Sequence, residues 1–274
     1  MKRTDVAEFG CLPPRYDSRD YKLQKACRAE PMPESFQLFR LPEVKNQGMT
    51  SSCTAHAASS ILEYFNGGTP RLSTQFLYGI KCAVSGHQTR GMCLGDACRI
   101  AQKFGDMLYE DCPGNEEVPG CFQKAELALD DAPKAERAAY FRIASYYTCK
   151  TVEDIKYAIV HHGPVLASIR WYDNFRATGN GILRGKESGK YAYHAVMLYG
   201  FNEDGFMAQN SWGRLWGRDG RFLIPYSIPI REAKAMIDME NTGDLVIPPR
   251  GKIIDVIYKA VNWLVNLLWR AVKR

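Results

Sequence analysis

The fold is decided by residues 44–65, which read VKNQGMTSSCTAHAASSILEYF. The second half of this stretch predicts a helix that begins near Cys53, because Ser51 or Ser52 can cap it and residues 66–68, Asn-Gly-Gly, can end it. Small residues fill its first turns, so another element must pack closely against them. A helix N-terminus carries unpaired N–H groups and a partial positive charge, which favour the thiolate form of Cys53. Cys53 is therefore a candidate nucleophile, although a buried structural cysteine would give the same local pattern.

Three polar residues elsewhere could assist such a nucleophile. Gln47 lies six residues before Cys53, so its amide and the Cys53 backbone N–H can point at one carbonyl oxygen and form an oxyanion hole. His194 lies inside an apolar predicted strand, where an imidazole needs a partner or a task. Asn210 follows 16 residues later and can orient that ring, with the adjacent Trp212 shielding the hydrogen bond from water.

Four motifs carry a resemblance to a known family. They are residues 44–48 with 52–55 (VKNQG and SCTA), residues 72–78 (LSTQFLY), residues 193–196 (YHAV), and residues 210–213 (NSWG) followed by Trp216, Gly217 and Gly220. In this order and spacing they resemble the papain family of cysteine peptidases over about residues 39–230. The resemblance implies an α+β fold with a helical left lobe, an antiparallel β-barrel right lobe and an active-site cleft between them. Thr54 and the short N-terminal segment resemble the bacterial, archaeal and viral members.

The resemblance also implies a role for each catalytic residue. Cys53 attacks the scissile carbonyl of a peptide or protein substrate, and His194 acts as general base and acid. Asn210 holds the imidazole, and Gln47 stabilises the oxyanion together with the Cys53 amide. No metal or organic cofactor is implied. His56, one turn after the nucleophile, is expected to be structural.

A substrate-binding set follows from the same resemblance. Gly91 is expected to pair its backbone with an extended substrate. The pocket for the second residue before the scissile bond (P2) is expected to prefer apolar or aromatic side chains. Ser51 and Met92 stand where many relatives have glycine, so either side chain could narrow the cleft. The expected substrate-binding residues are Gly91, Met92, Leu94, Ser168, Ala192, Tyr193 and Trp212.

Hydrophobic periodicity predicts the remaining elements. Helices are expected from residue 95 or 96 to 104 and from 152 to 162, the second opened by a capping box of Thr151 and Asp154. Strands are expected over residues 165–169, 191–199, 206–209 and 221–224, separated by turn signals. We therefore divide the chain into an extended segment (1–38), a papain-like peptidase domain (39–232) and a tail (233–274).

Composition excludes several other classes. The chain of 274 residues has a net charge of +6, but residues 249–274 hold six cations and one anion, so the preceding body carries about +1. The body therefore gives no indication of nucleic-acid binding. The nine cysteines include no C-x-x-C pair, which argues against zinc ribbons. No signal peptide is visible, so the localisation is unknown, with export by another route or membrane association left open.

The two ends of the chain suggest regulation. Residues 1–38 could complete the fold, or act as a short propeptide that covers the cleft; Cys11 or Cys27 could even form a disulfide with Cys53. Cys112 and Cys121 bracket a loop and could pair. Residues 252–272 predict a basic amphipathic helix, which fits a membrane surface, a partner protein or docking on the chain itself.

Two alternatives to peptide hydrolysis remain from sequence. The same acyl-enzyme could pass its acyl group to an amine, which would make the protein a transpeptidase or ligase. A closed cleft would instead leave a catalytically silent papain fold that serves as a binding or membrane-associated module.

Overall fold

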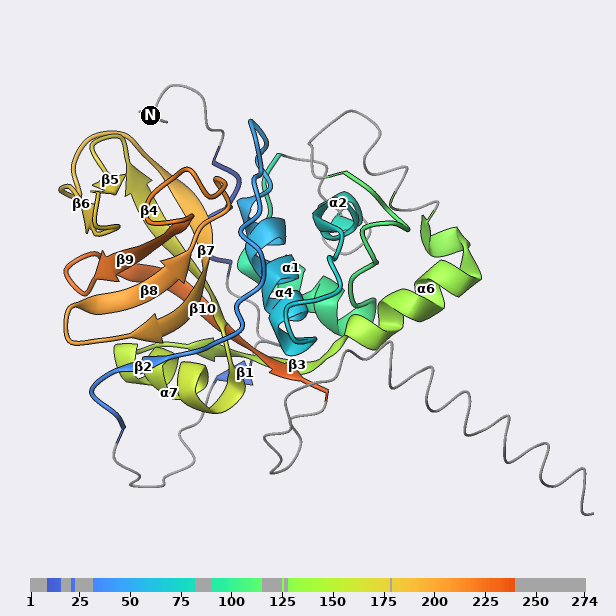
Figure 1. Ribbon diagram of the computed structural model, residues 1–274. Coiled ribbons are helices and arrows are strands. Elements are labelled where there is room, and N and C mark those ends of the chain that lie inside the picture. The colour runs from blue at the N-terminus through green and yellow to red at the C-terminus, as the bar shows by residue number, and fades with distance from the viewer. Residues whose placement is uncertain are drawn as a thin grey trace, which may run out of the picture.

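The computed structural model describes residues 9–15, 21–22, 32–81, 90–114, 125, 128–177 and 179–239. The helices are α1 (Cys53–Phe65), α2 (Thr74–Gly79), α4 (Leu94–Lys103), α6 (Ala132–Ala138) and α7 (Val152–His162), with a 3-10 turn η1 (Ala139–Phe141). The strands are β1 (Tyr21–Lys22), β2 (Phe36–Gln37), β3 (Ile143–Cys149), β4 (Val165–Tyr172), β5 (Arg176–Ala177), β6 (Leu183–Arg184), β7 (Tyr191–Phe201), β8 (Gly205–Gln209), β9 (Arg221–Pro225) and β10 (Ile230–Asp238). Helices α1, α2, α4 and α6 gather on one side, and most strands lie on the other side together with α7, which packs against the sheet (Figure 1).

One mainly antiparallel sheet organises the β side. Its order is β1-β3-β10-β4-β7-β8-β9, with β2 also paired to β7 and only β1 parallel to its neighbour β3. The central strands β4 and β7 are almost wholly buried, which their apolar sequences explain. This arrangement confirms the predicted α+β class.

Helix α1 lies between the sheet and the helices α2 and α4. It contacts β7 and β4 on one side and α2 and α4 on the other (Figure 1). Every residue of α1 except Tyr64 is buried. The small residues of its first turns, such as Ala55 and Ala58, allow this close approach. The N-terminal end of the helix is consequently fixed from several directions.

Most predicted elements are confirmed, with local corrections. The helix over 152–162 has the predicted capping box, in which the Thr151 hydroxyl accepts the Asp154 N–H. Ser52 is the N-cap residue of α1, but its hydroxyl makes no capping hydrogen bond; it bonds to Thr50 Oγ1 at 2.6 Å instead. Strands β3 and β10 were not predicted.

The predicted domain limit at residue 232 is wrong. Strand β10 continues to Asp238 and pairs with both β3 and β4, so residues 233–238 belong to the central sheet. The strand could not be recognised from its sequence, because it contains the charged residues Arg231, Glu232 and Lys234, and charged residues are uncommon in buried strands. The predicted helix over 252–272 lies outside the described residues. None of the described helices has the length and apolar character needed to span a bilayer.

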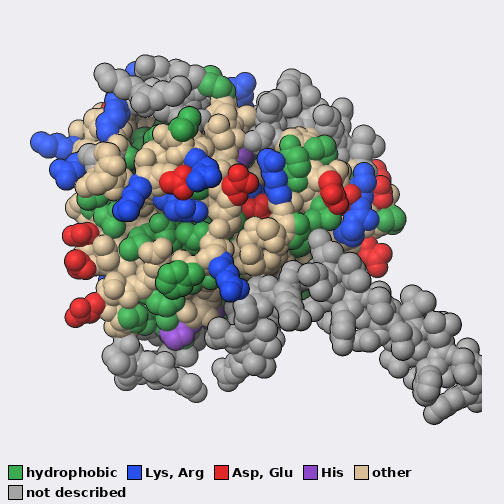
Figure 2. Space-filling model, viewed as in Figure 1, with side chains coloured by type: hydrophobic (Ala, Val, Ile, Leu, Met, Phe, Trp, Pro, Cys, Tyr) green, Lys and Arg blue, Asp and Glu red, His purple; other side chains and the backbone are tan. Residues whose placement is uncertain are grey.

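Charged side chains of both signs are interspersed on the face shown in Figure 2. No large patch of one sign dominates this face over either the strands or the helices. The mixture agrees with the small net charge expected for the body of the chain.

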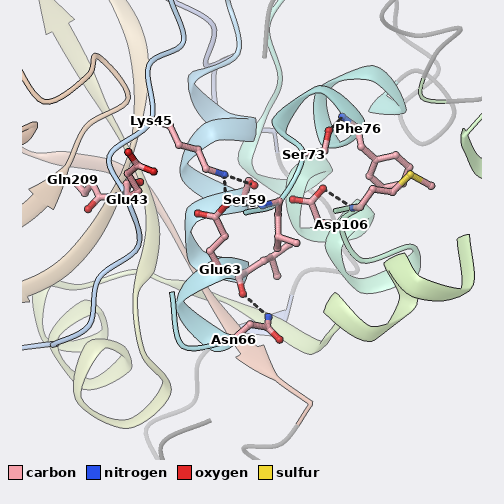
Figure 3. A network of polar contacts seen from close by, with 12 residues as sticks. Glu43, Lys45, Ser59, Glu63, Asn66, Ser73, Phe76, Asp106 and Gln209 are labelled. Carbon is pink, nitrogen blue, oxygen red and sulfur yellow. Dashed lines mark hydrogen bonds and ion pairs between the residues drawn. The ribbon is translucent and has the colours of Figure 1, made fainter. Parts of the chain in front are cut away.

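A buried ion pair joins the loop before α1 to the helix itself (Figure 3). Lys45 Nζ lies 2.9 Å from Glu63 Oε1 and donates to Ser59 Oγ at 2.6 Å. Glu63 Oε1 also accepts the backbone N–H of Leu72 at 2.7 Å. These extra hydrogen bonds are what a buried pair needs to offset its loss of hydration.

Asp106 lies beside this network and is fully buried. Its Oδ1 accepts the Met107 N–H at 2.9 Å, whereas Oδ2 has no partner among the described residues (Figure 3). Burial raises the pKa of Asp106 well above its usual range, and Lys45 opposes the rise. The fold therefore favours the protonated carboxyl.

We predict that Asp106→Asn removes a pH-dependent loss of stability. A carboxyl whose pKa is raised on folding stabilises the fold fully below its unfolded pKa of about 4, and this contribution declines as pH rises toward the folded pKa. The free energy of unfolding of the wild type should fall relative to Asp106→Asn by up to about 1.4 kcal/mol per pH unit above pH ~4. Urea unfolding at a series of pH values measures this difference, with the exposed Asp130→Asn as control. A difference that stays constant with pH would contradict the prediction.

Candidate active site

Cys53 opens α1 and faces β7. Its side chain is fully buried. The sulfur lies within hydrogen-bonding reach of the backbone N–H groups of Ala195 and Gly10. Ala195 follows His194 on β7, so the thiol of the helix lies beside the strand segment that carries the imidazole. Burial raises the pKa of the Cys53 thiol, although the two backbone contacts oppose the rise.

His194 is oriented by Asn210, as predicted. The His194 Nε2 lies 2.8 Å from Asn210 Oδ1. The same oxygen accepts the Ser211 N–H at 2.8 Å, so it acts as an acceptor toward the imidazole. Nε2 therefore carries a proton, and Nδ1 is the nitrogen that can exchange a proton with Cys53.

Aromatic rings enclose this histidine. The Trp212 ring centroid lies 4.6 Å from that of His194, and the Trp171 centroid lies 5.5 Å away at a steep angle. Phe9 adds a third ring at 5.6 Å. His194 and Asn210 are both buried, and the Trp212 ring lies against the histidine at the place where it was expected to shield this bond.

Gln47 is held with its amide in one orientation. Its Oε1 accepts the Ser211 hydroxyl at 2.5 Å, and its Nε2 donates to the Thr50 carbonyl at 2.7 Å. The Gln47 backbone N–H donates to the Ser211 carbonyl at 2.8 Å. Ser211 thus links Gln47 to Asn210, a role that sequence reasoning missed because a single serine carries no distinctive signal.

His56 has a structural role, as expected. Its Nδ1 lies 3.0 Å from the Ser52 carbonyl and 3.2 Å from the Ser52 hydroxyl. Burial lowers the pKa of His56 to about 3, so the ring is neutral. Its contacts with Ser52 tie it to the N-cap of α1, which agrees with the structural role expected for it.

Residues 9–12 lie across the nucleophile. The Gly10 carbonyl accepts the Met92 N–H at 2.7 Å, and the Leu12 N–H donates to the Met92 carbonyl at 3.1 Å. Cys11 forms bridges to Met92 on the helical side and to Tyr193 on β7. A Cβ on Gly10 would overlap the Ser51 carbonyl, so only glycine fits at this point. The segment therefore fills the space directly above Cys53.

The strand-pairing residue on the helical side is Met92, not Gly91. The Gly91 N–H donates to the Tyr78 hydroxyl at 2.9 Å, and its carbonyl accepts Lys81 Nζ at 2.8 Å. Both groups are therefore engaged inside the fold. The prediction for Gly91 is off by one residue. The Met92 side chain is fully buried and belongs to the hydrophobic cluster that also contains Cys11 and Cys53.

The predicted P2 residues surround Cys11 only in part. Ser168 on β4 lies opposite Ala195 on β7 and opposite Glu232 on β10. Glu232 was not predicted; it acts on the Cys11 thiol electrostatically and lies 3.5 Å from Lys234 Nζ. Both side chains of this ion pair are buried. Leu94 is buried at the start of α4, Ala192 is half-buried near the start of β7, and Tyr193 bridges to Cys11.

The described residues contain no cluster of His, Cys, Asp or Glu able to hold a metal ion. The chemistry available here is that of a thiol, an imidazole and hydrogen-bond donors. Such a set can attack a carbonyl carbon, stabilise the oxyanion and move a proton.

Comparison with known sequences points the same way. The chain is 29% identical over 235 residues to a cysteine protease of Blomia tropicalis, covering 78% of this chain and 62% of that protein. It is 29% identical over 123 residues to cathepsin B-like cysteine proteinase 1 of Haemonchus contortus, covering 43% of this chain and 35% of that protein. The chain thus spans 62% or less of the length of these relatives.

Comparison with solved structures supports the fold. Xylellain, a cysteine protease from Xylella fastidiosa, superposes with a TM-score of 0.72 at 22% identity, covering 88% of this chain and 99% of xylellain. Procathepsin B S9 from Trypanosoma congolense gives a TM-score of 0.64 at 21% identity, covering 86% and 87% of the two chains. The family model described as "Papain family cysteine protease" matches residues 33–241. The chain belongs to the papain family of cysteine proteases.

Proposed function

We propose that the protein is a cysteine peptidase that cleaves peptide bonds through an acyl-enzyme on Cys53. One observation carries the proposal: a single hydrogen-bonded unit holds His194, Asn210, Ser211 and Gln47 around the helix end that bears Cys53. A thiol without a task would not need an oriented imidazole and an oriented amide beside it.

The geometry supports a two-step reaction. The Cys53 sulfur attacks the carbonyl carbon, and His194 Nδ1, having taken the thiol proton, gives it to the leaving amine. Water then attacks the thioester, and the imidazole takes a proton from that water and returns it to the sulfur. The Gln47 amide and the Cys53 backbone N–H stabilise the oxyanion in both steps.

The P2 pocket is proposed to take apolar or aromatic side chains. Glu232 is the carboxylate that influences the Cys11 thiol, and it is paired with Lys234. A buried arginine from a substrate would be a second cation beside a single carboxylate, so one of the two cations would stay unpaired. The pocket therefore disfavours basic residues.

Residues 9–12 are proposed to inhibit the enzyme. The leaving amine of a substrate must lie near His194, so the N-terminal part of the substrate lies along Met92. In the segment the order is opposite, because Phe9 lies against His194 and Leu12 pairs with Met92. A segment that runs backwards occupies the cleft without presenting a bond that can be cleaved.

We predict that Gly10→Ala activates the enzyme. Its new Cβ overlaps the Ser51 backbone and expels the segment without shortening the chain. The initial rate on a fluorogenic peptide should rise at least about tenfold, a change of ~1.4 kcal/mol in segment binding. Gly179→Ala is the matched control, because a Cβ there meets nothing within 4 Å. An unchanged or lower rate in a folded variant would contradict inhibition.

We predict rapid alkylation of Cys53 at pH 6. A thiolate–imidazolium pair reacts there, whereas under about 1% of an ordinary thiol is ionised. Mass spectrometry after iodoacetamide treatment should show Cys53 labelled first. Labelling should be faster in Gly10→Ala than in the wild type, because the segment covers the Cys53 sulfur and burial raises the pKa of this thiol.

His194→Ala should abolish this reactivity, and Cys149→Ser, which removes a remote buried thiol, should not change it. Labelling of Cys53 no faster than that of free cysteine in both the wild type and Gly10→Ala would contradict the peptidase proposal.

We predict that substrates with Phe or Leu at P2 are cleaved with at least about tenfold higher kcat/KM than the matched Arg peptide, since a buried unpaired cation costs more than 1.4 kcal/mol. Fluorogenic peptides that differ only at P2 measure this ratio. A preference for Arg would mean that Glu232 is available to the substrate.

A further inference from the structure

Two thiols meet in the blocked cleft. Cys11 is held between Met92 and Tyr193, and only 6% of its surface is exposed. Cys53 is fully buried, and its sulfur lies against the N–H of Gly10, the residue before Cys11. The Thr54 hydroxyl lies against both sulfurs. Both thiols are free in the structure.

Backbone packing brings the same two residues together. The Met92 carbonyl accepts both the Thr54 hydroxyl at 2.9 Å and the Leu12 N–H at 3.1 Å. Gly10 lies so close to the Ser51 carbonyl that a Cβ would overlap it. Residues 10–12 therefore lie directly on the helix end that carries Cys53. The backbone on both sides of Cys11 is fixed by hydrogen bonds to Met92 at 2.7 and 3.1 Å, so the thiol is held where it is.

We propose that Cys11 and Cys53 form a disulfide when the protein meets a small-molecule disulfide such as oxidised glutathione, and that this bond locks residues 9–12 in the cleft. The inference rests on the proposed function, because the bond would silence the catalytic nucleophile. It makes the enzyme sensitive to the thiol–disulfide balance of its surroundings.

The exchange balances in two steps. With the segment displaced, the Cys53 thiolate attacks one sulfur of oxidised glutathione, which gives a Cys53–glutathione mixed disulfide and releases one glutathione thiolate. As the segment returns, the Cys11 thiol is still exposed to water and can ionise; its thiolate then attacks the Cys53 sulfur and releases the second glutathione. Cys11 and Cys53 are oxidised together, one oxidised glutathione is reduced to two thiols, and the two protein protons go to these products.

Cys93 is the competing partner near Cys11. It is the N-cap residue of α4, and burial with a hydrogen bond to Asp96 raises its pKa to about 12. A thiol of that kind is rarely ionised and attacks slowly. Cys53 is favoured over Cys93 because His194 can take its proton.

The test uses the full chain in glutathione buffers of increasing oxidation. After acid quenching and non-reducing digestion, mass spectrometry should show a peptide pair linked by Cys11 and Cys53. Turnover of the fluorogenic peptide should fall at least tenfold as the linked form accumulates, and dithiothreitol should restore it. Cys11→Ser should instead stop at the Cys53–glutathione adduct, while the matched control Cys149→Ser should behave as the wild type.

Two results would overturn the inference: a linkage of Cys11 to Cys93, or oxidised wild type that carries only the glutathione adduct. The proposed function is tested separately by turnover under fully reducing conditions. Reduced protein that cleaves peptides but never forms the link refutes the disulfide alone. Reduced wild type and Gly10→Ala that both fail to cleave refute the peptidase proposal, while the link remains measurable by mass.

Discussion

The burial of α1 on every side is the constraint on which the rest of the structure depends. A buried helix must satisfy its polar side chains inside the protein, and α1 does so with Glu63 and Ser59 bonded to Lys45. Lys45 lies two residues before Gln47. The ion pair that compensates the buried charge of Glu63 therefore also fixes the loop that carries the proposed oxyanion donor. The helix end that bears Cys53 faces residues 9–12, and Cys53 is fully buried beneath them.

The sheet carries His194 and Asn210, and backbone hydrogen bonds join this part of the site to the loop of Gln47. The loop of Gln47 pairs with residues 211–213, because the Gln47 N–H donates to Ser211 and the Gly213 N–H donates to Lys45. Asn210 is likewise fixed by its N–H to the Gly220 carbonyl. The catalytic groups from the two sides are therefore joined by short, buried bonds. Such support keeps reacting groups within the small tolerance that catalysis requires.

Local chemistry made much of this predictable. Three features can be recognised from the sequence without knowledge of the fold. They are the capping box at Thr151, the small residues of α1, and the order of Gln47, Cys53, His194 and Asn210. Long-range pairing does not. The buried Lys234 is paired with Glu232 and donates a hydrogen bond to the Thr148 hydroxyl. These partners are distant or charged in the sequence, so the sequence of β10 does not have the apolar pattern of a buried strand. The choice between Gly91 and Met92 depends on which backbone groups Tyr78 and Lys81 occupy, and no local pattern reveals that.

In the proposed mechanism, inhibition and substrate binding use the same atoms. The Met92 N–H and carbonyl that hold residues 10–12 are the groups proposed to pair with an extended substrate, and the Phe9 ring lies against His194 and Trp212. A substrate must therefore replace each contact of the segment rather than find new ones. The segment is tethered, so its effective concentration at the cleft is high and independent of dilution. Weak individual contacts can then keep the cleft closed, and the loss of a single close contact, such as the one that requires glycine at position 10, can open it.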